Sequence, residues 1–179
     1  CTFVLPEGVG EDYPYHDTDC HCATIDGIYY MLHDTKLTAT VVRSCNFVYR
    51  GRFVIPERVT YDGKDYQVTT IGYRAFAMDP DYIDYLDEYD KMDSLLEGAT
   101  HVEIPASIIL IEDEAFYMCH GLTTVVFRGN ILHIGENVFV NTNDDIQAII
   151  VPTHLKNRYQ KLLEKYDWLV TDCVAEVDG

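Results

Sequence analysis

A six-residue phrase that recurs three times is the feature that most constrains how this chain folds. The phrase has isoleucine first, alanine or valine fifth and phenylalanine sixth, and its copies begin at Ile71, Ile111 and Ile134. The last two copies lie 23 residues apart, and a fixed period of this size is typical of stacked repeats. Apolar residues at such spacings cannot form a core within one turn, but stacked turns bury them as continuous ladders. The phrase therefore predicts a solenoid.

The agreement between repeats extends well beyond the phrase. A shift of 23 residues superposes Ala99 on Leu122, Val102 on Val125, Ile104 on Phe127, Ile108 on Ile131, Ala115 on Val138 and Phe116 on Phe139. A partial unit around Ile149 follows after a one-residue slip, and Phe53 and Ile55 match Val102 and Ile104 upstream. These matches fix which strand residues should face the core.

Several motifs resemble a known family. They are the Ile-Pro pairs, the Ile-Gly-x-x-Ala-Phe phrase, and Cys119 followed by Leu122 and Val125. Over about residues 23–173 the chain resembles the BspA-like leucine-rich repeats of bacterial surface proteins. The resemblance implies an α/β repeat fold, a short leucine-rich-repeat solenoid with repeats of about 23 residues. Two features depart from it: the first repeat is interrupted twice, and residues 1–22 match nothing in the family.

The predicted organisation has four parts. Residues 1–22 form an acidic N-terminal extension, and residues 23–50 a β-hairpin that caps the first turn. The repeats occupy residues 51–152, with a helical insertion at about 79–97, and residues 153–179 form a C-terminal helical cap and tail. Caps are expected because the terminal turns of a solenoid have no neighbour to cover their core.

Two hairpins are expected within this plan. The first joins apolar residues of 28–32 and 37–41 through a turn at 33–36, and alternation of apolar and polar residues supports both strands. The second joins Val59 and Tyr61 to Tyr66 and Val68 across Asp62-Gly63. Asp-Gly is favoured in a type I′ turn because both central residues need a positive φ.

Two helices are also expected. Residues 79–97 carry tyrosine and leucine at helical spacing among acidic residues, with Pro80 suited to the first turn and Gly98 to the end. This acidic helix either only packs on the solenoid or contributes to a binding surface. Near the C-terminus one helical face carries Leu155, Tyr159, Leu162, Leu163 and Tyr166.

The cysteines suggest three different roles. Cys119 occupies an apolar repeat position, where cysteine packs as a small hydrophobe. Cys20, Cys22 and Cys45 lie near the predicted N-terminal cap, which favours a disulfide in an exported protein, with the pairing left open. Cys1 either is the lipid-bearing first residue of a bacterial lipoprotein, which it resembles, or marks an arbitrary boundary. The expected location is the bacterial cell surface or outer membrane, without a transmembrane segment and with a possible lipid anchor.

Two segments carry candidate metal ligands. His16, Asp17, Asp19 and the Cys20-His21-Cys22 run could hold zinc, but they lack the usual Cys-x2–4-Cys spacing and a second pair. Residues 141–145 offer oxygens to calcium but lack the glycine and terminal glutamate of an EF-hand. We therefore predict no metal site and no cofactor.

Charge and missing motifs exclude other classes of function. The chain has 30 acidic against 13 basic residues, and such a field repels nucleic acid. The sequence contains no phosphate loop, no Gly-x-Ser-x-Gly and no His-Glu-x-x-His. We predict a protein without catalytic residues.

Strand alternation then predicts a binding surface. If Val125 and Phe127 face the core, their neighbours project from the concave sheet. The resulting strip comprises Arg52, Val54, His101, Glu103, Thr124, Val126, Arg128, Ala148 and Ile150. Its mixture of apolar and charged residues suits a protein contact, and the resemblance implies adhesion to a host or matrix protein. The alternatives are a self-assembly module of a surface lipoprotein and a metal-binding protein that uses the N-terminal Cys/His segment.

Overall fold

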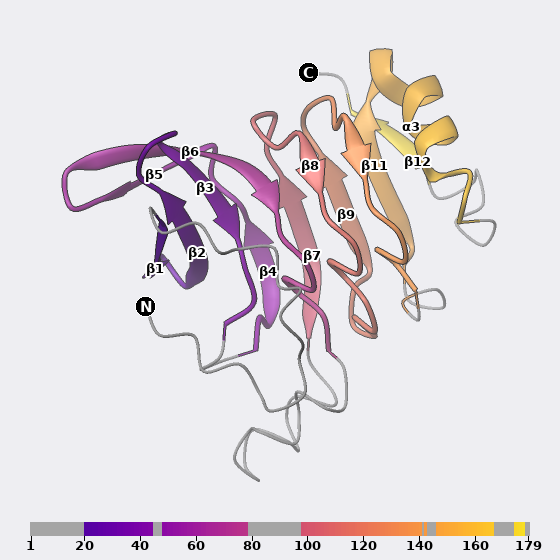
Figure 1. The fold of residues 1–179 in the computed structure, drawn as a ribbon. Helices are drawn as coiled ribbons and strands as arrows, with labels where there is room; N and C mark the ends of the chain where they lie inside the picture. The colour runs from indigo at the N-terminus through magenta and orange to yellow at the C-terminus, as the bar shows by residue number, and fades with distance from the viewer. Residues whose placement is uncertain are drawn as a thin grey trace, which may run out of the picture.

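A computed structural model describes residues 20–44, 48–78, 98–140, 142, 146–166 and 174–177, the last of these as backbone only. Two sheets make up the fold, and strands of successive repeats follow one another along the molecule in Figure 1. A short helical segment follows the last repeat strand.

The second sheet is built from the repeats and is parallel throughout. Its strands are β4 (Gly51–Val54), β7 (Ala99–Ile104), β9 (Thr124–Phe127), β11 (Ala148–Pro152) and β12 (Val174–Val177), in the spatial order β12-β11-β9-β7-β4. Val102 pairs with Val125 and Ile104 with Phe127, the predicted shift of 23 residues. The one-residue slip is also present, because Ile149 pairs with Val125.

The first sheet combines hairpins with repeat strands. It contains β1 (Cys20–Ile25), β2 (Ile28–His33), β3 (Thr38–Val41), β5 (Arg58–Tyr61), β6 (Lys64–Ile71), β8 (Leu110–Ile111) and β10 (His133–Ile134). The pairs β1–β2, β2–β3 and β5–β6 are antiparallel, whereas β3–β6, β6–β8 and β8–β10 are parallel. The long strand β6 therefore joins the hairpin region to the repeats.

The Asp-Gly turns have the backbone that the sequence predicts. Asp62 and Gly63 have φ values of 47° and 74°, and Val59 pairs with Tyr66 beside them, so the second hairpin is confirmed. The β2–β3 hairpin is confirmed as well. A third hairpin, β1–β2, turns at Asp26-Gly27 with φ values of 49° and 80° and was not predicted. Its first strand begins at Cys20 and thus crosses the predicted boundary after residue 22.

Stacked phenylalanines form the centre of the core. The Phe76 and Phe116 rings are 5.0 Å apart and 11° from parallel, and those of Phe116 and Phe139 are 5.5 Å apart and 7° from parallel. All three are buried, Phe116 completely. Tyr49 adjoins this phenylalanine ladder at 4.7 Å from Phe76, and Tyr166 meets Phe139 edge-on at 5.6 Å.

The fourth position of the phrase has an unusual backbone conformation in every copy. Arg74, Glu114 and Asn137 have φ values of 51°, 56° and 54°. Asparagine tolerates this left-handed region well, whereas arginine and glutamate adopt it rarely. The Arg74 guanidinium pairs with the Glu114 carboxylate across adjacent copies, so the two less suited residues gain an ion pair where the backbone turns.

The predicted apolar face of the C-terminal helical segment packs against the core. A short 3-10 turn (Thr153–Leu155) leads into α3 (Lys156–Leu163). On the predicted face Tyr159, Leu163 and Tyr166 are buried, and Leu155 and Leu162 pack partly buried against the core.

The predicted leucine-rich-repeat fold is confirmed at the coarse level, and the described residues contain strands, a 3-10 turn and one of the two predicted helices. A regular solenoid over residues 51–152 is not confirmed, because the offset of 23 residues holds only between β7 and β9 and between β8 and β10. The predicted acidic helix at 79–97 lies outside the described residues, apart from its flanking Gly98. The parallel strand β12 was not predicted.

A candidate partner-binding face

The predicted strip lies on one face of the second sheet, which we call the strip face. Its members align in two cross-strand rows, Arg52–His101–Thr124–Ala148 and Val54–Glu103–Val126–Ile150. The rows result from strand alternation, in which successive side chains point to opposite faces of the sheet. The intervening Val102, Val125 and Ile149 accordingly lie on the other face, where they are completely buried. Arg128 follows β9 and its side chain contacts Glu103.

The exposure of the strip residues is uneven. Arg52, Val54 and Arg128 are exposed, with Val54 at 53%, and five others are half-buried. Val126 departs from the prediction, because only 4% of its surface is exposed. It lies between Glu103 and Ile150 on the neighbouring strands, and larger side chains on both sides leave it little surface to offer a partner.

Three charged groups are linked on the strip face. Arg128 Nε donates a hydrogen bond of 2.8 Å to Glu103 Oε1, and Arg52 Nη2 lies 3.6 Å from Glu103 Oε2. The hydrogen bond from Arg128 and the charges of both arginines hold the pKa of Glu103 below its ordinary value. Glu103 is therefore ionised at neutral pH, and the three groups together carry one net positive charge.

His101 lies beside this ionic cluster and is neutral at neutral pH. Burial, followed by the charge of Arg52, lowers its pKa. Its Nε2 is buried without a hydrogen-bond partner among the described residues. His101 therefore contributes ring surface rather than charge to the strip face.

The strip face has a gradient of polarity. The β4 and β7 side carries Arg52, Glu103 and the Arg128 guanidinium that reaches toward it. The β9 and β11 side carries Thr124, Ala148 and Ile150, which are uncharged and half-buried. A ligand that spans the four strands would meet cations at one end and apolar carbon at the other.

A second polar cluster, which the sequence did not reveal, lies in the hairpin region. Asp34 Oδ2 is 2.9 Å from His21 Nδ1, and Asp34 Oδ1 accepts hydrogen bonds from Lys64 Nζ at 2.6 Å and Tyr66 at 2.7 Å. The bond from Lys64 is the largest cause that lowers the Asp34 pKa to about 2. The Tyr61 and His21 rings are 5.2 Å apart and tilted by 44° from parallel. The five residues come from three strands and a turn, so only the fold brings them together.

The remaining predicted sites are only partly covered by the structure. Cys119 is completely buried, its thiol donates to the Phe76 carbonyl, and burial raises its pKa to about 12, which agrees with a packing role. Cys20 and Cys22 are half-buried on β1. Cys1, His16, Asp17, Asp19, Cys45 and residues 141 and 143–145 lie outside the described residues. Within the described part, no three His, Cys, Asp or Glu side chains are grouped as a metal would require.

None of the helices in the described part of the chain combines the length and apolar character needed to cross a membrane.

Comparison with known proteins identifies the repeats. Residues 96–170 match the BspA type leucine rich repeat region. No curated protein matches the sequence. A leucine-rich repeat protein from Bacteroides ovatus is 25% identical, with a TM-score of 0.54, over 73% of this chain and 29% of its own.

Two further structures are more distantly similar. A leucine rich cell surface protein from Faecalibacterium prausnitzii is 23% identical, with a TM-score of 0.48, over 73% of this chain and 33% of its own. The pneumococcal vaccine antigen PcpA is 20% identical, with a TM-score of 0.45, over 74% of this chain and 32% of its own. The chain thus spans about a third of the length of these proteins. The matched region and the stacked register together show that residues 96–170 of this chain carry BspA type leucine-rich repeats.

Proposed function

We propose that this chain is a non-catalytic recognition and adhesion module of the cell surface that binds a protein partner through the strip face. The observation that carries the proposal is the alignment of exposed Val54 and Arg52 with half-buried Ala148 and Ile150 in continuous rows. A mixed patch of this kind is typical of non-obligate protein interfaces. The family supports a surface module without catalytic residues.

The two ends of the repeats support a scaffold role. We propose that the N-terminal hairpins and the segment from Thr153 onward act as caps of a short solenoid. Tyr159 and Tyr166 each hydrogen-bond a carbonyl and an amide of the last repeat, and Lys165 bonds the carbonyls of Ile134 and Gly135. These side chains bond backbone groups of the last repeat that a further strand would otherwise pair with.

A display selection tests the proposed binding face. Binders would be selected from a random peptide library against the intact chain, and their affinities measured for two variants. We expect Ile150→Glu to weaken face binders at least about tenfold, because it places an unpaired charge in the apolar half of the face. The control is Leu132→Glu, which introduces the same charge at an apolar side chain. Leu132 is 59% exposed and lies outside the second sheet.

The selection also has outcomes against the proposal. Binders that respond to Leu132→Glu but not to Ile150→Glu would place recognition elsewhere. A stable dimer in light scattering that Ile150→Glu dissociates would instead favour self-assembly through this face.

A further inference from the structure

We infer that the strip face recognises a short acidic segment of its partner, in which a carboxylate lies next to an apolar residue. This inference rests on the proposed function, since it names the chemistry of the partner that the same face binds. It begins from the arginines, whose charge contrasts with a chain of net charge −17.

The two arginines keep donors available for a ligand. Glu103 receives the Nε donor of Arg128 and lies 3.6 Å from Arg52, beyond hydrogen-bond reach. The side chain of Arg52 is 66% exposed and that of Arg128 is 45% exposed. Guanidinium groups present paired N–H donors that fit a carboxylate. Glu103 therefore holds Arg128 by one hydrogen bond and attracts Arg52 without occupying all the donors of either arginine.

The charge balance selects an acidic ligand. The two arginines and Glu103 carry one net positive charge, and His101 adds none because burial lowers its pKa. A basic segment would be repelled there, and a neutral one would leave the guanidinium donors unmatched. The electrostatic complementarity of this face therefore points to a carboxylate.

The uncharged half of the face limits the ligand further. Ala148 and Ile150 on β11 lie in the same rows as Arg52 and Val54 on β4. Neighbouring strands are about 4.8 Å apart, so the charged and apolar halves are about 10 to 15 Å from each other. An extended peptide of a few residues covers this distance. The net charge of −17 also limits the ligand to a short segment with few carboxylates, because a longer polyanion would be repelled by the rest of the chain.

The test uses three fluorescently labelled peptides in which leucine alternates with aspartate, with asparagine or with lysine. The intact chain is titrated into each peptide, and the fluorescence anisotropy of the peptide gives its affinity. We expect the aspartate peptide to bind at least about tenfold more tightly than the other two, as one charge-assisted hydrogen-bonded pair would give. Arg52→Ala and Arg128→Ala should each remove most of that preference. The matched control is Arg58→Ala, because Arg58 is an exposed arginine on β5 of the other sheet.

The outcomes separate this inference from the proposed function. Equal binding of the aspartate and asparagine peptides would overturn the inference that the ligand is acidic. A preference for aspartate that survives both arginine variants would overturn it as well. Binders from the display selection that respond to Ile150→Glu but carry lysine or no charge would leave the face as a binding site and refute only the inference. If no peptide responds to Ile150→Glu, the proposed function fails as well.

Discussion

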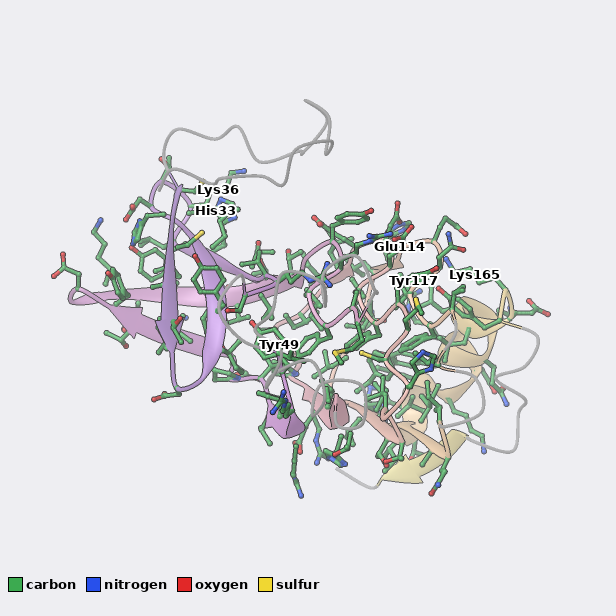
Figure 2. All side chains as sticks on the ribbon, turned by 90° about the horizontal axis from the view of Figure 1, so that it is seen from below. His33, Lys36, Tyr49, Glu114, Tyr117 and Lys165 are labelled. Atoms are coloured by element: carbon green, nitrogen blue, oxygen red, sulfur yellow. The ribbon has the colours of Figure 1, made fainter. Side chains whose placement is uncertain are left out.

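The two ends of the repeat region are completed in different ways. At the N-terminal end, whole strands extend the first sheet, and β3 pairs in parallel with β6 through backbone hydrogen bonds. At the C-terminal end of that sheet, β10 has only two residues, and side chains of Tyr159, Lys165 and Tyr166 bond the nearby backbone. Figure 2 shows Lys165 at one end of the molecule and His33 and Lys36 at the other.

This difference indicates where single substitutions should matter most. Backbone pairing at the N-terminal end survives the loss of most side chains. At the C-terminal end, the first sheet depends on a few side-chain hydroxyl and ammonium groups, whereas β12 extends the second sheet by backbone pairing. Tyr49 is the N-terminal exception, since its hydroxyl donates to Val42 O at 2.7 Å and accepts from Tyr29 N at 2.9 Å.

The largest expected effect lies between the two ends, in the phenylalanine ladder. Phe116→Ala should reduce the free energy of unfolding by about 3–5 kcal/mol, because a completely buried ring that stacks on two others leaves a cavity. Urea denaturation monitored by circular dichroism measures this loss. A loss below about 1 kcal/mol would mean that the ladder contributes little and that the ends dominate stability.

The next prediction concerns how closely the last repeats stack. A Cβ on Gly129 would lie 2.4 Å from the Ala106 Cα, so Gly129→Ala must displace backbone and should cost about 1–3 kcal/mol. Gly121→Ala is the matched control, because its added Cβ meets no atom closer than 3.6 Å. Similar thermal midpoints for the two variants would contradict the close contact.

Removal of a tyrosine hydroxyl tests whether the C-terminal end depends on side-chain hydrogen bonds. Tyr166→Phe leaves Val138 N without its hydrogen-bond partner, whereas Gly135 O keeps the Lys165 ammonium, and the change should cost about 1–3 kcal/mol. Amide hydrogen exchange should accelerate at Val138 before it does on β3. Tyr61→Phe, at an exposed position of the β5–β6 hairpin, should change stability by less than about 0.5 kcal/mol. If both variants unfold alike, the C-terminal end does not depend on that hydroxyl.

The smallest effect is expected in the N-terminal hairpins and depends on pH. Because the folded pKa of Asp34 is about 2, below its ordinary 3.8, ionisation of this group favours the folded state. Its contribution is present above pH 4 or so and is lost as the pH falls toward about 2. Asp34→Asn should therefore lower the thermal midpoint slightly at pH 6 and have no such effect at pH 2. A difference independent of pH would point to packing rather than charge.

The sequence predicted the core more completely than the surface. Pairing of Ile104 with Phe127 followed from the repeat alone, since both positions must be apolar in every turn. The β1–β2 hairpin was missed although Asp26-Gly27 has the same turn signal as Asp62-Gly63, because the segment before it matches no repeat.

Two features of the surface could not have been read from the sequence. The low exposure of Val126 depends on the size and conformation of side chains on adjacent strands. The contact of Asp34 with Lys64 joins residues 30 positions apart that only the packing of two hairpins brings together. Strand alternation assigns a side chain to a face, but it does not determine which neighbours cover or pair with it.

One repeat has the same register in both sheets, and this has a consequence for how such proteins change in length. His101 pairs with Thr124 in one sheet and Leu110 with His133 in the other, so both sheets advance by the same 23 residues. Duplication of one such unit within the repeats would add a strand to each sheet and leave both ends unchanged. Each duplication would widen the strip face by about 4.8 Å. Gene duplication can therefore adjust the width of the strip face in steps, without a change in the residues that complete the two ends.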